Sequence, residues 1–405
     1  MALQPTPQSI KLSYDGLFKI QYVHNPFALR PVSYTGLASY LECPGCAQEQ
    51  RHKRRPKEPK QFTPIRQPTL FGKGEPDARL VGTLLHTLVN FLHDPAGPLS
   101  ERQREALLAD RAALVRFLRQ DLLTALQRAG RFKLAQFFDA LRLDEEMLTT
   151  NLIAPMLLYQ RNLASTRAVV FTAAERFQFK LLSTRNTFTN HPDWGGYVTL
   201  VGEFDQIRLH GVGSKDLPGG VPAIIEFKKG LGRTRRESVL TSMAGTTHMG
   251  ENKKPPRPLD LAQPTIAHAM QLMVYWMAFQ TRWDIFDKFK SAKGMLEDIQ
   301  MSLYQALDLI LYNLNDGCQY RLLITDLREA LQALTNCIFY LDWVMKSGYA
   351  WQSPEHDCRK TQLVELPTLT IPVGSTSITA QECYALAREA FDKFKATIRW
   401  EIFSL

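Results

Sequence analysis

The hydrophobic pattern changes period twice along the chain, and these changes separate helical from β regions. Apolar residues recur at helical spacing from about residue 77 to about residue 163. Alternation at every second residue replaces that spacing in AVVFTAAERFQFKLL (168–182) and GYVTLVGEFDQIRLH (196–210). From PTIAHAMQLMVYWMAFQ (264–280) onward the pattern is again mostly helical. The sequence therefore predicts an α/β protein with a β-sheet in the middle of the chain.

Cap signals mark where several of these helices begin. Ser100 and Gln103 form a capping-box pattern that opens an amphipathic helix reaching Gly130. Thr379 and Glu382 form the same pattern before the last helix. These signals predict a helical segment after residue 95 and a helical end to the chain.

The stretch AIIEFKKG (223–230) predicts a central strand with charged residues on one side. Ile225 and Phe227 face one way, whereas Ile224, Glu226 and Lys228 face the other. Both faces are rich in apolar residues, which is typical of a strand buried within a sheet. The residues before it, HGVGSKDLPGGV (210–221), are typical of a turn. We therefore expect this strand and the strand that contains Asp205 to form a hairpin.

The hairpin can bring two carboxylates and a lysine together. Asp205 shares its parity with Ile207 and Leu209, so it projects from a largely apolar face. A buried carboxylate is costly unless it is paired or binds a metal. Asp205 beside Glu226 would suit a hard cation such as Mg²⁺, with Lys228 roughly 6–7 Å further along the strand. The alternative is an ion pair of Lys228 with one acid that serves structure alone.

Composition narrows the function only in part. The chain has 405 residues and a formal net charge of +9, from 49 Lys and Arg against 40 Asp and Glu. This excess favours a polyanionic partner without identifying nucleic acid. No run approaches the about 18 apolar residues of a membrane span, and no ATP-binding P-loop motif is present. Six cysteines in a chain of this size favour a reducing, cytoplasmic setting over a disulfide framework.

Further motifs surround these carboxylates in a fixed order along the chain. SYTGLASYLECPGC (33–46) predicts a short helix that ends at Pro44, with spacing S-x-x-x-L-x-x-Y-x-x-C-P. GTLLH (82–86), Glu175, GEFDQI, IIEFKKG and QLMVY (271–275) follow. In this order they resemble the PD-(D/E)XK nuclease superfamily, specifically its RecB-like branch, over residues 33–280. The ordered set is much more specific than any single motif.

The resemblance implies a role for each matching residue. His86 would be a metal ligand on a helix, and Asp205 and Glu226 would be the metal-binding carboxylates. The Phe227 carbonyl would be a further oxygen ligand, and Lys228 would be the catalytic lysine. Gln271 and Tyr275, on one helix face with His268, would contact the lysine, the water or the substrate. Each residue also has a simpler interpretation: His86 could be a core histidine, and Gln271 and Tyr275 could be buried polar groups that form hydrogen bonds with loops.

The resemblance also implies a fold and four segments. We expect a restriction-endonuclease-like core with a central mixed sheet flanked by helices. Residues 1–94 would be its N-terminal part with the CPGC segment, and residues 95–165 a helical insertion. Residues 166–285 would be the PD-(D/E)XK catalytic core, and 286–405 a helical C-terminal region that packs on it.

The implied activity is metal-dependent hydrolysis of DNA phosphodiester bonds with Mg²⁺ or Mn²⁺. An exonuclease in DNA repair, recombination or defence against foreign DNA is expected, working with a separate helicase or a defence or CRISPR partner. A non-catalytic nucleic-acid-binding or scaffold subunit with the same fold is the alternative. Two basic loop segments would hold the phosphate backbone: Lys53, Arg54, Arg55, Arg233, Arg235 and Arg236.

The cysteines match part of a further family feature. Several RecB-like nucleases hold an iron–sulfur cluster with one cysteine upstream and three near the C-terminus. Cys43 matches the upstream ligand and Cys358 the first downstream one, whereas Thr361 stands where the second would be. Cys43 and Cys46 could instead bind zinc with Cys358 and His356. Free cysteines in packed helices are the simpler alternative.

Overall fold

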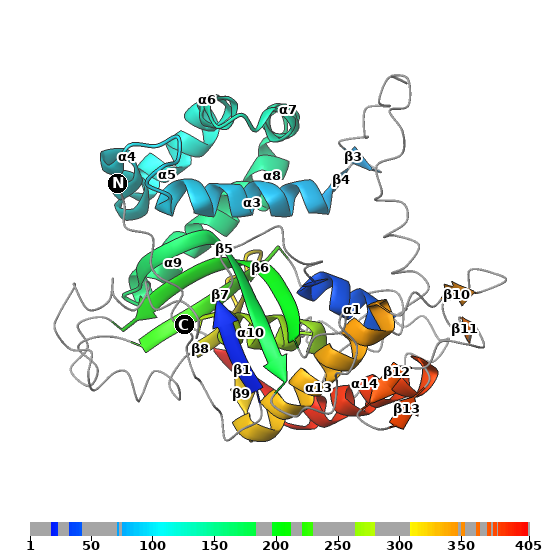
Figure 1. Cartoon of the computed structure of the whole chain (residues 1–405). Helices are drawn as coiled ribbons and strands as arrows, with labels where there is room; N and C mark the ends of the chain where they lie inside the picture. Colours follow the sequence, from blue (N-terminus) through cyan, green and yellow to red (C-terminus); the bar gives the residue numbers. More distant parts are fainter. Residues whose placement is uncertain are drawn as a thin grey trace, which may run out of the picture.

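A computed structural model gives the architecture of the chain. It describes residues 18–22, 32–42, 71–72, 75–183, 197–211, 221–229, 264–279, 308–346, 350–352, 362–364, 371–373, 376–378 and 380–403. Within this part, an open, mixed β-sheet lies between two layers of helices (Figure 1). The expected α/β class, with a mixed central sheet flanked by helices, is therefore confirmed.

Within the described residues, the central sheet has eight strands in the order β1-β5-β6-β7-β8-β9-β14, with β2 beside β6. Neighbours are antiparallel except for the β7–β8 and β2–β6 pairs, which are parallel. The strands are β1 (Phe18–Tyr22), β2 (Val32–Ser33), β5 (Val169–Ser183), β6 (Tyr197–His210), β7 (Val221–Lys228), β8 (Asp308–Asn313), β9 (Gln319–Ile324) and β14 (Ile398–Phe403).

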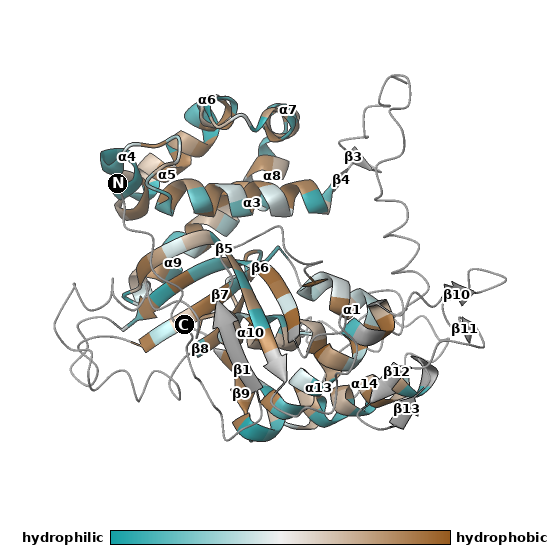
Figure 2. Ribbon diagram, viewed as in Figure 1, coloured by the Kyte–Doolittle hydropathy of each residue, from teal (hydrophilic) through white to brown (hydrophobic). Residues whose placement is uncertain are grey.

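The helices between residues 78 and 165 cover one face of the sheet. They are α3 (Ala78–His93), α4 (Glu101–Ala109), α5 (Arg111–Arg116), η1 (Phe117–Asp121), α6 (Leu122–Arg128), α7 (Phe132–Leu141), α8 (Glu145–Leu148), η2 (Thr149–Ile153) and α9 (Ala154–Ser165). Their apolar residues form one core with Ala223, Ile225 and Phe227 of β7. Figure 2 shows α4, at the outside of this layer, as largely hydrophilic.

A second set of helices covers the other face: α1 (Tyr34–Glu42), α10 (Ile266–Phe279), α13 (Leu327–Lys346) and α14 (Ala380–Ala396). They form a second core with Ile224 of β7 and with Phe204 and Ile207 of β6. In the part of the chain that the structure describes, three two-stranded antiparallel sheets lie outside the main sheet: β3 (Phe71–Gly72) with β4 (Glu75–Pro76), β10 (Ala350–Gln352) with β11 (Gln362–Val364), and β12 (Ile371–Val373) with β13 (Thr376–Ile378).

Several predicted elements are confirmed. The strand predicted at AIIEFKKG is β7, which is buried along most of its length and pairs with β6 as the expected antiparallel hairpin. Ser33 directly precedes α1, and its hydroxyl accepts a hydrogen bond from the Gly36 N–H at 3.1 Å, as a cap residue would. The capping box of Ser100 and Gln103 is present. No helix within the described residues combines the length and apolar content that a bilayer crossing requires.

Two predictions need correction. The expected continuous helix from residue 100 to Gly130 is broken, because the Asp110 side chain accepts from the Ala112 N–H and starts a new helix, α5. The region after residue 264 contains the helices α10, α13 and α14, but it also supplies β8, β9 and β14 to the central sheet, and these strands were not predicted. Buried strands such as DLILYN (308–313) are short apolar runs, and their periodicity does not separate them from buried helix.

The side-chain alternation of β6 also differs from the prediction. Leu200 and Phe204 lie in the same core as Ile207, so the alternation changes phase between Phe204 and Ile207. On the neighbouring strand, Ala174 has a φ of +54°, which a residue with a Cβ rarely adopts. Asp205 therefore lies at a local irregularity of the sheet and not on a regular apolar face.

Candidate active site

Asp205 lies where β6 separates from β7. The ladder between these strands ends at Gln206 and Ile225, whereas β7 stays paired with β8 as far as Lys228. The Phe227 N–H no longer reaches a backbone carbonyl of β6 and instead donates to Asp205 Oδ2 at 2.8 Å. The Asp205 carboxylate thus replaces one rung of the ladder and is held beside the buried strand.

His86 contacts the other oxygen of the same carboxylate. Its Nδ1 lies 3.3 Å from Asp205 Oδ1, and its ring packs edge-on against the Phe227 ring with centroids 6.1 Å apart. His86 comes from α3, where the neighbouring Gly82 brings the helix close to β7: a Cβ at Gly82 would lie 3.7 Å from that of Lys229. The helix therefore passes β7 at ordinary van der Waals distance near Gly82 and brings His86 to Asp205.

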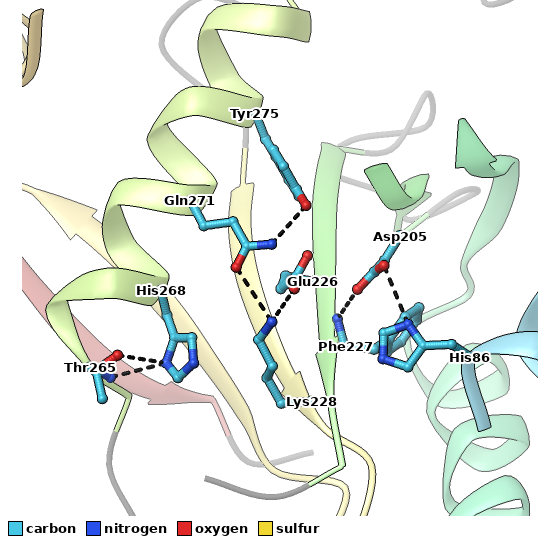
Figure 3. Close-up of polar contacts among 9 residues, drawn as sticks. All are labelled: His86, Asp205, Glu226, Phe227, Lys228, Thr265, His268, Gln271 and Tyr275. Atoms are coloured by element: carbon cyan, nitrogen blue, oxygen red, sulfur yellow. Dashed lines mark hydrogen bonds and ion pairs between the residues drawn. The ribbon is translucent and has the colours of Figure 1, made fainter. Parts of the chain in front are cut away.

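Glu226 and Lys228 point to the opposite face, toward α10 (Figure 3). The Lys228 ammonium forms an ion pair with Glu226 Oε1 and lies 3.4 Å from Gln271 Oε1. Gln271 Nε2 in turn donates to the Tyr275 hydroxyl at 2.7 Å. One polar chain therefore runs from β7 to α10 through four of the residues predicted to form the site.

The Tyr275 ring is fixed by aromatic packing. It makes edge contacts with Phe204 and Phe177, at centroid distances of 5.4 and 5.5 Å. Gly202 provides the space for Phe177, because a Cβ there would lie 2.4 Å from the ring. The sheet thus holds the tyrosine that orients Gln271.

The buried charges in this cluster shift one another's protonation. Burial and the negative charge of Asp205 raise the pKa of Glu226 to about 7, although Lys228 partly offsets them. Burial would raise the pKa of Asp205 too, but His86, Lys228 and the Phe227 N–H outweigh it and hold that pKa below its usual value. Burial alone would lower the pKa of Lys228, yet the two carboxylates raise it. Asp205 is therefore the stronger acid of the two, and Glu226 the weaker one.

His268 adds a neutral side chain on the lysine side of the cluster (Figure 3). Its Nδ1 accepts from the Thr265 N–H at 3.1 Å, so the ring proton lies on Nε2. Burial and the charge of Lys228 lower the pKa of His268 to about 3. The ring therefore stays neutral and offers an N–H donor over a wide pH range.

The helical spacing predicted that His268 shares a face with Gln271, but no role was predicted for His268, and Thr265 was not predicted to be part of the site. The spacing T-x-x-H at the start of α10 is the signal that could have indicated this fixed ring. Lys229, on the other side of β7, was not predicted to act and donates to Asn151 Oδ1 of η2 at 3.3 Å.

The donor types suit a hard divalent cation, but the arrangement is not that of a complete ligand set. Glu226 Oε2 is buried without a hydrogen-bond partner, which leaves one carboxylate oxygen available. Among the residues that the structure describes, no three His, Cys, Asp or Glu side chains group around one point as metal ligands would. Mg²⁺ or Mn²⁺ at His86, Asp205, Glu226 and the Phe227 carbonyl stays a prediction.

The other predicted ligands lie outside the described residues: Cys43, Cys46, Cys358, Lys53, Arg54, Arg55, Arg233, Arg235 and Arg236. The iron–sulfur or zinc site and the phosphate-binding loops therefore stay predictions as well. Metal and sulfide analysis of protein purified with and without air would test the cysteines.

The structure thus gathers His86, Asp205, Glu226, Phe227, Lys228, Gln271 and Tyr275, which span 190 positions of the sequence, around one end of β7. Comparisons with protein-family models, curated proteins and solved structures found no match for this chain.

Proposed function

We propose that this chain is a metal-dependent deoxyribonuclease of the PD-(D/E)XK type, with β5–β8, α3 and α10 as a restriction-endonuclease-like core. The observation that carries the proposal is the meeting of the buried Glu226 carboxylate, the partly buried Asp205 carboxylate and Lys228 where β6 leaves β7. Packing alone does not call for this arrangement, because buried charges are costly and this cluster contains several. Perturbed carboxylates beside a lysine favour a functional site.

In this proposal Asp205 and Glu226 would hold the cation, with His86 and the Phe227 carbonyl as further ligands. When bound, the cation would polarise the scissile phosphate and lower the pKa of a water molecule. Lys228, held between Glu226 and Gln271, would stabilise negative charge that develops on the phosphate. Tyr275 fixes the Gln271 amide, and the Nε2–H of His268 would be a donor for a phosphate oxygen.

The substrate in this proposal is DNA, as the resemblance implies, and the net charge of +9 favours a polyanionic partner. We propose exonuclease action in repair, recombination or defence against foreign DNA, in the cytoplasm. A separate helicase or a defence or CRISPR protein would supply the DNA end, because the sequence has no P-loop motif.

A non-catalytic nucleic-acid-binding or scaffold subunit is the second candidate. The observation that favours it is the closed ion pair between Lys228 and Glu226, which occupies both groups in the absence of metal. In a scaffold this pair would be structural, and Asp205→Asn would change stability but have no cleavage to abolish.

The test is a cleavage assay with linear and circular DNA, each single- and double-stranded, and with RNA. Mg²⁺, Mn²⁺ or EDTA is added, and acid-soluble nucleotides are measured. We expect cleavage of DNA that EDTA abolishes and that Asp205→Asn reduces to background. An exonuclease would spare circular DNA. No cleavage of any substrate, or equal cleavage by wild type and Asp205→Asn, would contradict the proposal.

A further inference from the structure

A second polar cluster lies on the face of β6 that the helices between residues 78 and 165 cover. Its centre is Arg208, whose side chain is fully buried, with a relative exposure of 0%. The guanidinium makes one hydrogen bond, from Nη2 to Gln319 Oε1 at 3.4 Å. Its Nε and Nη1 have no hydrogen-bond partner, and neither has Gln319 Nε2. The cluster therefore contains buried donors that lack acceptors.

No acid in the described part of the chain balances this charge. Across the sheet, Arg208 pairs with Ala223, and Ala223 pairs with Asp308. The Asp308 carboxylate, however, is bound by Arg321, whose Nε lies 2.8 Å from Oδ1. Asp308 is thus already paired, and Arg208 remains an interior cation without a counter-charge.

The neighbouring titratable groups are neutral as well. Tyr159 of α9 accepts from Gln206 Nε2 at 2.8 Å, and its hydroxyl lies 2.6 Å from His93 Nε2. Burial raises the pKa of the Tyr159 phenol, and it raises that of Tyr312. Burial and the charge of Arg208 lower the pKa of His93 to about 4. None of these groups carries the negative charge that Arg208 requires.

His210, two residues along β6, completes the set. Burial, Arg208 and Arg321 lower its pKa to about 3, and its Nε2 has no partner. The cluster therefore has an excess of positive charge.

An unpaired guanidinium cannot relieve its burial by losing a proton, since its pKa stays far above neutral. Buried charges in proteins are paired or coordinated. We infer that Arg208 binds a small inorganic anion, such as chloride, enclosed between β6, β9 and α9, with Gln319 Nε2 as a second donor. A small ion is favoured over a larger ligand because Arg208, Gln319, Tyr312 and Tyr159 are all fully buried.

The anion would connect the helical layer to the strand that carries Asp205. Tyr159 belongs to α9, contacts Gln206 next to Asp205, and packs edge-on against Phe227 with ring centroids 5.7 Å apart. Anion binding at Arg208 would therefore stabilise the packing of α9 against Gln206 and Phe227, next to the candidate active site. This inference does not depend on the proposed nuclease activity.

The test is thermal unfolding in sodium chloride and in sodium gluconate at equal ionic strength, in a buffer free of phosphate and sulfate. We expect Tm to rise with chloride by about 1–2 °C for each tenfold increase above its dissociation constant, and to stay flat in gluconate. Gln319→Glu places a carboxylate beside Arg208 and should remove the dependence on chloride while raising Tm in gluconate.

Arg176→Gln is the matched control, because Arg176 is 88% exposed and pairs with Glu203 at the surface. It should keep the chloride dependence of the wild type. Equal Tm of the wild type in chloride and gluconate would overturn the inference, as would a chloride dependence that Gln319→Glu retains. If Gln319→Glu does not fold, anomalous diffraction from bromide-soaked wild-type crystals decides: a peak beside Arg208 supports the site, and none there overturns it.

Discussion

The two faces of the β6–β7 pair carry polar clusters that differ in how their charges are compensated. On the α10 face, Glu226 and Lys228 are ion-paired, and Asp205 at the strand junction is bound by His86 and a backbone N–H. On the α9 face, Arg208 is buried with no acid partner among the described residues, and its neighbours are neutral. In the first cluster, a metal cation could replace Lys228 as the partner of Glu226, and the buried negative charge would stay compensated. The second requires an anion to become balanced.

The largest expected effect breaks the first cluster. Glu226→Gln removes a negative charge and a ligand, so we expect the affinity for Mn²⁺ to fall at least about a hundredfold, measured by isothermal titration calorimetry. Glu203→Gln, on the exposed side of β6, is the control and should bind Mn²⁺ as the wild type does. Equal affinity of wild type and Glu226→Gln would place the metal elsewhere.

Much of this cluster could be predicted from sequence because its residues stand in short, ordered motifs. The alternation in AIIEFKKG placed Glu226 and Lys228 on one face, and the helical spacing of Gln271 and Tyr275 placed them together. The contact of His86 with Asp205 joins residues 119 positions apart, and the phase change at Asp205 depends on the neighbouring strand. Neither is visible in a local pattern.

The second cluster could not be predicted for a related reason. In DQIRLH (205–210), Gln206 and Arg208 alternate with apolar residues, which is typical of a solvated face. The helices that bury this face come from residues 78–165, and Gln319 comes from a strand that the sequence did not reveal. The burial of Arg208 is thus a tertiary property.

The second expected effect is on the pH dependence of stability, through His93 in the second cluster. His93 has a folded-state pKa of about 4, below its unfolded value near 6.5, so the unfolded chain binds the proton more tightly. Stability from the neutral ring is present above pH 6.5 and is lost as pH falls toward 4, at up to about 1.4 kcal/mol per pH unit. His93→Gln should flatten the pH dependence of urea unfolding between pH 7 and 5. Parallel curves for the two proteins would contradict this.

The smallest expected effect is a difference in stability between the loss of two buried tyrosine hydroxyls. Tyr159→Phe removes the partner of Gln206 and His93, and should lower the free energy of unfolding by about 1–3 kcal/mol. The Tyr312 hydroxyl has no partner, so Tyr312→Phe in gluconate should change stability by at most about 0.5 kcal/mol. Denaturant titration measures both. Equal losses would show that the hydrogen bonds to Tyr159 are not what the second cluster depends on.

The most direct test of the central claim compares two adjacent lysines on β7. Lys228 lies in the acidic cluster, whereas Lys229 contacts Asn151 on the other side. DNA cleavage with Mg²⁺ is measured for wild type, Lys228→Met and Lys229→Met, with Tm checked for each. The account predicts that Lys228→Met lowers the rate by about a thousandfold and that Lys229→Met stays within about threefold of wild type. Equal rates for wild type and Lys228→Met, in folded protein, would contradict it.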